Sequence, residues 1–139
     1  MANQRHLHAY QNTQVTSASP LQLVIMLYDG AIRFVKQGRE AVVAGDTFNQ
    51  NRCIQKAQRI VTELMSCLDM HRGGEVAQNL FALYSYAYNE LVMGNIEDNP
   101  EMLDRAIKVL EDLRSSWVEL DRQQRTGSIG ELDAKPNAA

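Results

Sequence analysis

The sequence predicts an all-α protein: an antiparallel four-helix bundle with a mobile N-terminal arm, residues 1–18, and a disordered C-terminal tail, residues 126–139. Three observations lead to this fold class. Apolar residues recur at intervals of three and four along four long stretches, which is the period of one helix face. Only 3 Pro and 8 Gly interrupt the 139 residues, and short connections favour helices that run antiparallel to their neighbours. No alternation of apolar and polar residues is long enough to indicate strands.

The composition is that of one soluble globular domain, with 45% hydrophobic and 22% charged residues. A net charge of −3 argues against a nucleic-acid partner. The charge is unevenly spread, because basic residues prevail from Arg33 to Arg72 and acidic residues from Glu90 to Asp121. Solvated helix faces account for most of this pattern. The alternative is a bipolar surface that orients a partner.

No segment predicts export or membrane insertion. The N-terminus lacks the apolar region of a secretory signal, and the longest purely apolar run, Leu23 to Tyr28, is far shorter than the ~20 residues that span a bilayer. Cys53 and Cys67 lie fourteen positions apart on one predicted helix, which separates them too far for a disulfide. We therefore expect a cytoplasmic protein with two reduced cysteines.

The first helix is predicted over Pro20–Ala44. Ser19 is a suitable N-cap, Gln22 stands three residues later as a capping box requires, and Pro20 suits the first helical position. Gly45 ends the helix as a C-cap glycine, and Asp46 can cap the next one.

Apolar side chains cover more of this first helix than one buried face needs. A helix on a globular surface typically has an apolar stripe of roughly 100°, and this stripe is about twice as wide. Either the helix is central, or part of its surface is kept for another chain. Gly30 lies at the edge of the stripe beside Leu23, Leu27 and Phe34. It would form a notch for a partner helix or a point of tight packing within the bundle, and the pattern leaves both open.

Three further helices are predicted over Thr47–Met70, Glu75–Asn95 and Pro100–Gln124, so the bundle is expected to occupy residues 19–125. The third helix is also broadly apolar, whereas the fourth has a narrow stripe and charged outer faces. The predicted core residues are Ile54, Ala57, Val61, Leu64 and Leu68; Ala77, Leu80, Tyr84, Ala87 and Leu91; and Leu103, Ala106, Leu110, Leu113, Trp117 and Leu120.

The motifs of enzymes and metal proteins are missing from the sequence. None of the 3 His has a glutamate three residues before it, as a di-metal carboxylate bundle requires. Gly73-Gly74 lacks the Lys-Ser/Thr of a phosphate-binding loop. Cys53 and Cys67 are interpreted as small apolar residues, and an acidic last helix argues against helix-turn-helix DNA binding. We expect no catalytic residue, no metal and no cofactor.

A series of short motifs runs through residues 10–120. The most specific is the block that joins Ser17-Ala-Ser-Pro20 to Leu27-Tyr-Asp-Gly-Ala31. The others are Tyr10-Gln-Asn12, Lys56-Ala-Gln58, Glu63-Leu64, Leu68-Asp69, Gly73-Gly74, Asn79-Leu80 followed by Leu83-Tyr84, and Leu113-Arg114 followed by Trp117. In order and spacing they resemble the flagellar secretion chaperones, the FliS family. The tail after Thr126 lies outside this resemblance.

The resemblance implies a cytoplasmic four-helix bundle that binds the disordered C-terminal segment of flagellin. It implies that binding blocks premature polymerisation and delivers flagellin to a component of the flagellar type III export gate. It also implies an N-terminal arm that lies over the binding groove and moves when flagellin arrives. The predicted partner-binding residues are Leu7 and Tyr10 in the arm and Leu23, Leu27, Gly30 and Phe34 on the first helix.

Two other hypotheses remain open. The spare apolar surface could serve a self-associating structural bundle or adaptor, which would form at least a weak homodimer. A small metal-dependent bundle enzyme is the third, and the absence of Glu-x-x-His pairs already argues against it.

Overall fold

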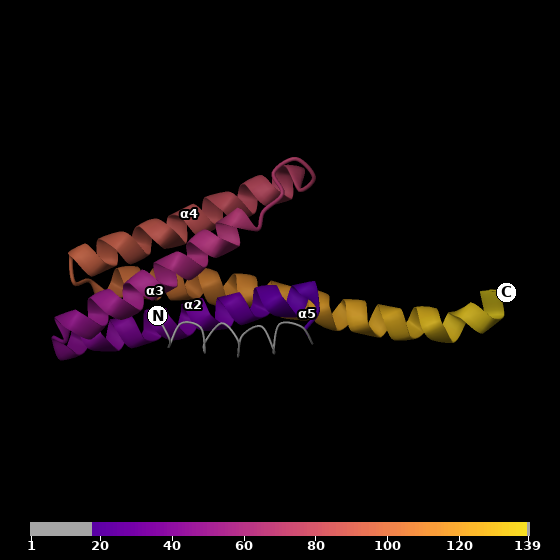
Figure 1. Ribbon diagram of the computed structural model, residues 1–139, viewed down its shortest axis with the longest axis horizontal. Coiled ribbons are helices and arrows are strands. Elements are labelled where there is room, and N and C mark those ends of the chain that lie inside the picture. Colours follow the sequence, from indigo (N-terminus) through magenta and orange to yellow (C-terminus); the bar gives the residue numbers. More distant parts are fainter. Residues whose placement is uncertain (1–17, 139) are drawn as a thin grey trace, which may run out of the picture. The chain divides into compact units, whose positions relative to one another are not determined.

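A computed structural model describes the backbone of residues 18–138 and the side chains of residues 18–127. Within that part the chain is helical, without strands, and the all-α prediction is confirmed (Figure 1). The chain divides into two compact units, Leu27–Ser115 and a second unit made of Met1–Met26 with Ser116–Ala139. The helices are α2 (Pro20–Ala44), α3 (Thr47–Ser66), α4 (Gly74–Ile96) and α5 (Pro100–Ala138).

The unit Leu27–Ser115 is the bundle, and its polar contacts establish the direction of the helices. As residue numbers rise along one helix, the numbers of their partners fall along the next, so neighbouring helices run antiparallel. The pairs are Asp29–Arg114, Lys36–Glu111 and Arg39–Asp104 between α2 and α5, Gln50–Asn95 between α3 and α4, and Glu90–Arg105 between α4 and α5. Close contacts of Gly30 with Ile60, Gly38 with Ile54 and Gly94 with Leu103, and a groove that Met65 and Ser85 line together, add to the polar pairs. The predicted antiparallel four-helix bundle is confirmed.

The bundle core draws on all four helices. The Tyr28 hydroxyl of α2 shares a hydrogen bond with the Tyr84 hydroxyl of α4, and both side chains are buried. At Gly38, α2 and α3 approach so closely that an added Cβ would lie 2.6 Å from Ile54 Cγ1. The other fully buried large side chains are Val35, Val61, Leu64, Leu91, Leu103 and Leu110.

The predicted boundaries of α2 are confirmed. The Ser19 hydroxyl accepts a hydrogen bond from the Gln22 N–H at 3.2 Å, and the Ser19 N–H donates to Gln22 Oε1 at 3.1 Å, which is a complete capping box. At the other end Gly45 has a φ of +72°, a left-handed conformation that glycine adopts without strain. Asp46 then caps α3 by accepting from the Asn49 N–H.

Helix α3 ends at Ser66, four residues before the predicted end at Met70, so that boundary was wrong. Asp69 Oδ1 accepts hydrogen bonds from the backbone N–H groups of His71 and Arg72, at 3.1 and 3.0 Å. A side chain that bonds nearby N–H groups offers the backbone an alternative to the helix. The connection to α4 begins there.

Helix α5 continues to Ala138, beyond the predicted end at Gln124. Within the described side chains, ion pairs one turn apart support it, between Glu119 and Arg122 and between Asp121 and Arg125. The side chains after Gly127 lie outside the described residues, as does the whole structure of residues 1–17. The disordered tail and the mobile arm therefore stay predictions. In the described part, every helix is too short or too polar to cross a bilayer.

Candidate partner-binding site

Three of the predicted site residues lie on the side of α2 that faces α3. Leu27, Gly30 and Phe34 are each half-buried, whereas the residues on the neighbouring arc, among them Ala31 and Val35, are fully buried. The broad stripe of this helix therefore has a core side and a partly exposed edge. Helix periodicity places the three half-buried residues in one row.

Gly30 is in contact with α3 of the same bundle. An added Cβ at Gly30 would lie 3.2 Å from Cδ1 of Ile60, a half-buried residue. The tip of Ile60 thus fills the notch that the missing side chain leaves. We call the surface formed by Leu27, Gly30, Phe34 and Ile60 the α2–α3 strip.

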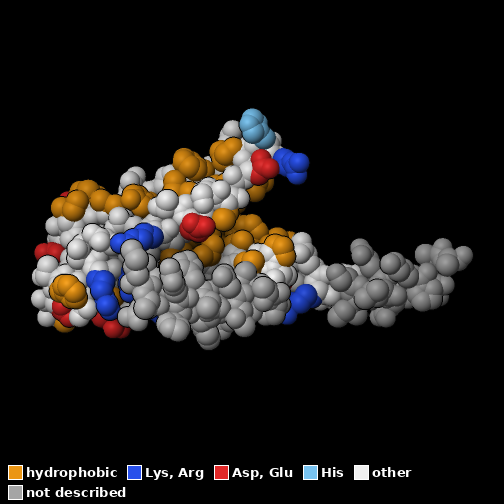
Figure 2. Space-filling view, viewed as in Figure 1, with side chains coloured by type: hydrophobic (Ala, Val, Ile, Leu, Met, Phe, Trp, Pro, Cys, Tyr) orange, Lys and Arg blue, Asp and Glu red, His pale blue; other side chains and the backbone are white. Residues whose placement is uncertain are grey.

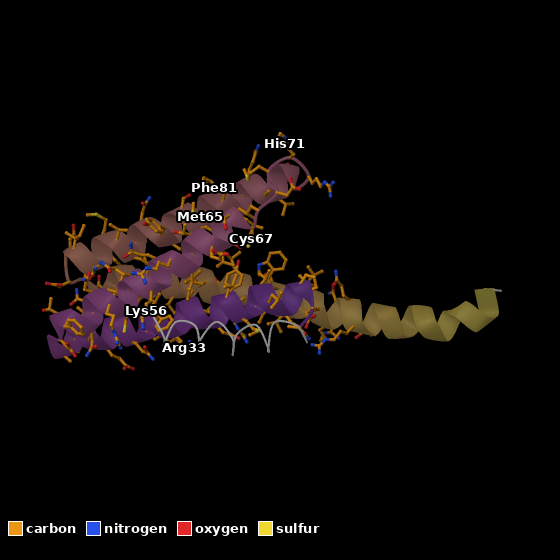
Figure 3. The ribbon with its side chains drawn as sticks, viewed as in Figure 1. Arg33, Lys56, Met65, Cys67, His71 and Phe81 are labelled. Carbon is orange, nitrogen blue, oxygen red and sulfur yellow. The ribbon has the colours of Figure 1, made fainter. Side chains whose placement is uncertain are left out.

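Two cations flank the aromatic ring of the α2–α3 strip. The Arg33 guanidinium lies 5.1 Å and the Lys56 ammonium 5.2 Å from the centroid of the Phe34 ring, within the range of a cation–π interaction. Figure 3 labels Arg33 on α2 and Lys56 on α3, the two helices that form the strip. Sequence reasoning missed both cations and Ile60. The excess of basic residues between Arg33 and Arg72 was the available signal.

Leu23, Leu7 and Tyr10 are the remaining predicted site residues. Leu23 is half-buried on α2 and belongs to the unit formed by the chain ends. Leu7 and Tyr10 lie outside the described residues.

Helix α4 carries further apolar side chains at the surface, as its broad pattern predicted. Leu83, Tyr86 and Met93 are 40–42% exposed and lie on one side of the helix. Phe81, which is 43% exposed, lies on the side toward α3. Figure 2 shows hydrophobic side chains along the outer face of α4. Figure 3 labels Phe81 on α4 and Met65 on the adjacent α3. A groove of about 400 Å³ between these helices is lined by Thr62, Met65, Ser85, Tyr88 and Asn89.

The groove between α2 and α5 is larger, about 550 Å³, and most of the side chains that line it are charged. Two ion pairs cross it, Lys36 with Glu111 and Asp29 with Arg114, and Arg33 and Glu40 also line it. Close to it, a hydrogen bond to Asp104 raises the pKa of Arg39. Paired charges do not offer an apolar surface for a partner helix.

The described side chains contain no cluster of three or more His, Cys, Asp or Glu that could hold a metal ion. Cys53 is buried, and its thiol donates a long hydrogen bond to Gln37 Oε1 at 3.7 Å. Cys67 is exposed.

Comparisons with known proteins agree with this description. The family model of the flagellar protein FliS matches residues 1–124. The flagellar secretion chaperone FliS of Vibrio cholerae serotype O1 is 35% identical over 130 residues, which cover 91% of this chain and 96% of the relative. That of Bacillus subtilis is 34% identical over 133 residues, covering 94% and 98%.

A solved structure supports the fold alone. The crystal structure of a flagellar chaperone from bacteria superposes with a TM-score of 0.70, at 17% identity, over 87% of this chain and 98% of that chain. The family model and the two relatives, by contrast, cover nearly the whole chain at an identity that establishes kinship. The chain belongs to the FliS family of flagellar secretion chaperones, which are not enzymes.

Proposed function

We propose that this protein is a cytoplasmic chaperone of flagellar export. It binds the disordered C-terminal segment of flagellin, prevents premature polymerisation and delivers the subunit to a component of the export gate. Membership of the FliS family supports the chaperone role. The finer statements, on flagellin, the gate and the compartment, are the proposal.

The observation that carries the proposal is apolar surface left open beside a well-packed core. The core is shielded from solvent, since the side chains of Tyr28, Ile54 and Leu110 are each 0% exposed. Large apolar side chains nevertheless remain partly exposed on the α2–α3 strip and along α4. Contiguous apolar surface on a folded domain commonly marks a site of protein interaction.

A disordered partner suits this kind of surface. A segment that folds on binding loses conformational entropy, so it must bury a large apolar area to bind at all. A row of apolar residues on one helix face, such as Leu27 and Phe34 two turns apart, accepts an amphipathic helix in a groove. We place one helical part of the flagellin segment on the α2–α3 strip.

Leu7, Tyr10 and Leu23 complete the proposed site. In the proposal, the N-terminal arm covers the apolar surface in the free protein and is displaced by flagellin. Covering such a surface would limit aggregation of the empty chaperone.

The test is binding of a flagellin C-terminal fragment to a Leu27→Asp variant and a Phe34→Ala variant. Burial of one such side chain is worth about 1.5–3 kcal/mol, so we expect the affinity to fall roughly 10- to 100-fold. Calorimetric titration would measure it, and circular dichroism would confirm that each variant stays helical.

Val43→Asp is the matched control. Val43 is 68% exposed and lies nine positions after Phe34 on α2, on the opposite side of that helix, so this variant should keep the wild-type affinity. Unchanged affinity in both strip variants would remove the strip from the site. A wild-type protein that does not bind the fragment would end the proposal itself.

A further inference from the structure

Four basic side chains have no carboxylate partner among the described residues. They are Arg33 on α2 and Arg52, Lys56 and Arg59 on α3, and we call them the cationic cluster. Each of the other Lys and Arg side chains in residues 18–127 has a carboxylate within salt-bridge distance, namely Lys36, Arg39, Arg72, Arg105, Lys108, Arg114, Arg122 and Arg125.

The unpaired cations occur on adjacent helices. Arg52, Lys56 and Arg59 are spaced by four and three residues, so they form one row along α3 about 10.5 Å long. Arg33 approaches the same row, because it shares the Phe34 ring with Lys56. Figure 2 shows Lys and Arg side chains gathered over α3.

The N-terminal segment cannot neutralise this cluster. Residues 1–17 contain no Asp and no Glu. The cluster therefore lacks a carboxylate partner among the side chains of residues 18–127 and in the whole segment before them. The α2–α3 strip meets the cluster at Phe34, whose ring contacts Arg33 and Lys56. Arg59 lies farther along α3, in a groove that Tyr88 of α4 also lines.

We propose that the α2–α3 face selects an amphipathic helical segment that carries a row of carboxylates beside its apolar row. The inference rests on the proposed function, and it names the chemistry of the cargo segment that occupies this face. The apolar row of the segment packs on Leu27, Phe34 and Ile60. Its carboxylates, spaced by about one helical turn, meet the row from Arg52 to Arg59.

The cluster gives selectivity as well as attraction. A neutral or basic segment on the strip would cover the cations without supplying a counter-charge, which costs free energy. An acidic row pairs them instead. Because the whole protein has a net charge of −3, long-range electrostatics disfavour an acidic segment, and a preference for one must come from this local cluster.

The test uses two synthetic helical peptides with the same apolar row, one with a glutamate row beside it and one with a lysine row. Fluorescence anisotropy on the full chain measures both affinities at low and high salt. We expect the glutamate peptide to bind at least about tenfold more tightly, because its carboxylates pair with the cluster whereas lysines in the same row repel it. The preference should shrink at high salt.

Two double variants locate the effect. Lys56→Gln with Arg59→Gln should abolish most of the preference. Lys36→Gln with Lys108→Gln removes the same charge from exposed ion pairs and should leave the preference intact.

Equal affinities for the two peptides, undetectable binding of the glutamate peptide, or an equal loss in both double variants would overturn the inference. A flagellin fragment that binds while the peptides are not distinguished leaves the proposed function standing without this inference. If the glutamate peptide is preferred but the flagellin fragment does not bind, the acidic preference of the α2–α3 face stands and the proposed function falls.

Discussion

Gly38 and Gly30 both face α3, but they leave different room for a side chain. A Cβ on Gly38 would lie 2.6 Å from Cγ1 of Ile54, which is fully buried and cannot easily move. A Cβ on Gly30 would lie 3.2 Å from Cδ1 of Ile60, the free end of a half-buried side chain. Of these two positions, Gly38 is the one at which α2 and α3 leave no room for a side chain.

Alanine substitutions should therefore act in opposite directions at the two glycines. Gly38→Ala overpacks the core, which typically costs about 1–3 kcal/mol, and the gain of about 1 kcal/mol in helix propensity offsets only part of it. Gly30→Ala retains most of that gain, because Ile60 can rotate. Urea denaturation should give a lower midpoint for Gly38→Ala and an equal or higher one for Gly30→Ala. Equal shifts would contradict the difference in packing.

The two readings of Gly30 could not be separated from the sequence. The apolar period of α2 places Gly30 at the edge of the stripe, which fits both a notch for a partner and tight packing inside the bundle. Which side chain fills the space depends on the register of α3 against α2, and a period within one helix does not encode that register. The contact with Ile60 shows packing within the chain, and a role for Gly30 toward flagellin stays a proposal.

At the scale of the element, the start of α3 carries a pH-dependent contribution to stability. The side-chain amide and the backbone N–H of Asn49 donate to the Asp46 carboxylate and lower its pKa below the ordinary 3.8. The ionised cap therefore stabilises the fold above pH 3.8. That contribution is lost as the pH falls through the lowered pKa of the folded state, because the unfolded chain binds the proton more readily.

Asp46→Asn should remove this contribution without removing the cap, since asparagine is an equally good N-cap residue. Unfolding free energies of both proteins, measured by urea from neutral to acidic pH, should differ by a constant amount at neutral pH. The difference should shift in favour of the variant as the wild-type carboxylate protonates. A pH-independent difference would show that this carboxylate does not titrate differently in the folded state.

Helix boundaries with a strong local signal were more predictable than the end of α3. Ser19 with Gln22 starts α2, Gly45 ends it and Asp46 starts α3, and the structure contains the capping contacts and the left-handed glycine that these residues predict. The end of α3 depends on the Asp69 side chain turning back to the following N–H groups. An aspartate also tolerates a helical position, so the sequence alone did not specify that turn.

At the scale of the molecule, the fold was predictable from the sequence and the site only in part. Four apolar periods and short connections are enough for an antiparallel bundle. The cationic cluster, by contrast, is defined by missing partners, and pairing across helices such as Arg39 with Asp104 depends on tertiary register. The sequence showed an excess of basic residues between Arg33 and Arg72, without showing which of them stay unpaired.

Self-association is the alternative use of the spare apolar surface, and it predicts a different stoichiometry. A stable dimer buries about 1,200–2,000 Å² in one self-complementary patch. The exposed apolar residues of α4 lie instead on two sides of the helix, with Phe81 toward α3 and Val76, Leu83, Tyr86 and Met93 on the opposite side. A second copy bound to one of these sides would leave the other side uncovered.

We therefore expect the free protein to be a monomer at micromolar concentration and to bind the flagellin fragment one to one. Sedimentation equilibrium of the full chain, with and without the fragment, measures both quantities. A Tyr86→Asp variant is the control for the α4 surface, because it would dissociate any dimer built on that face. A micromolar dimer that this variant dissociates would support the structural bundle instead, because apolar surface occupied by a second copy is not free for an export cargo.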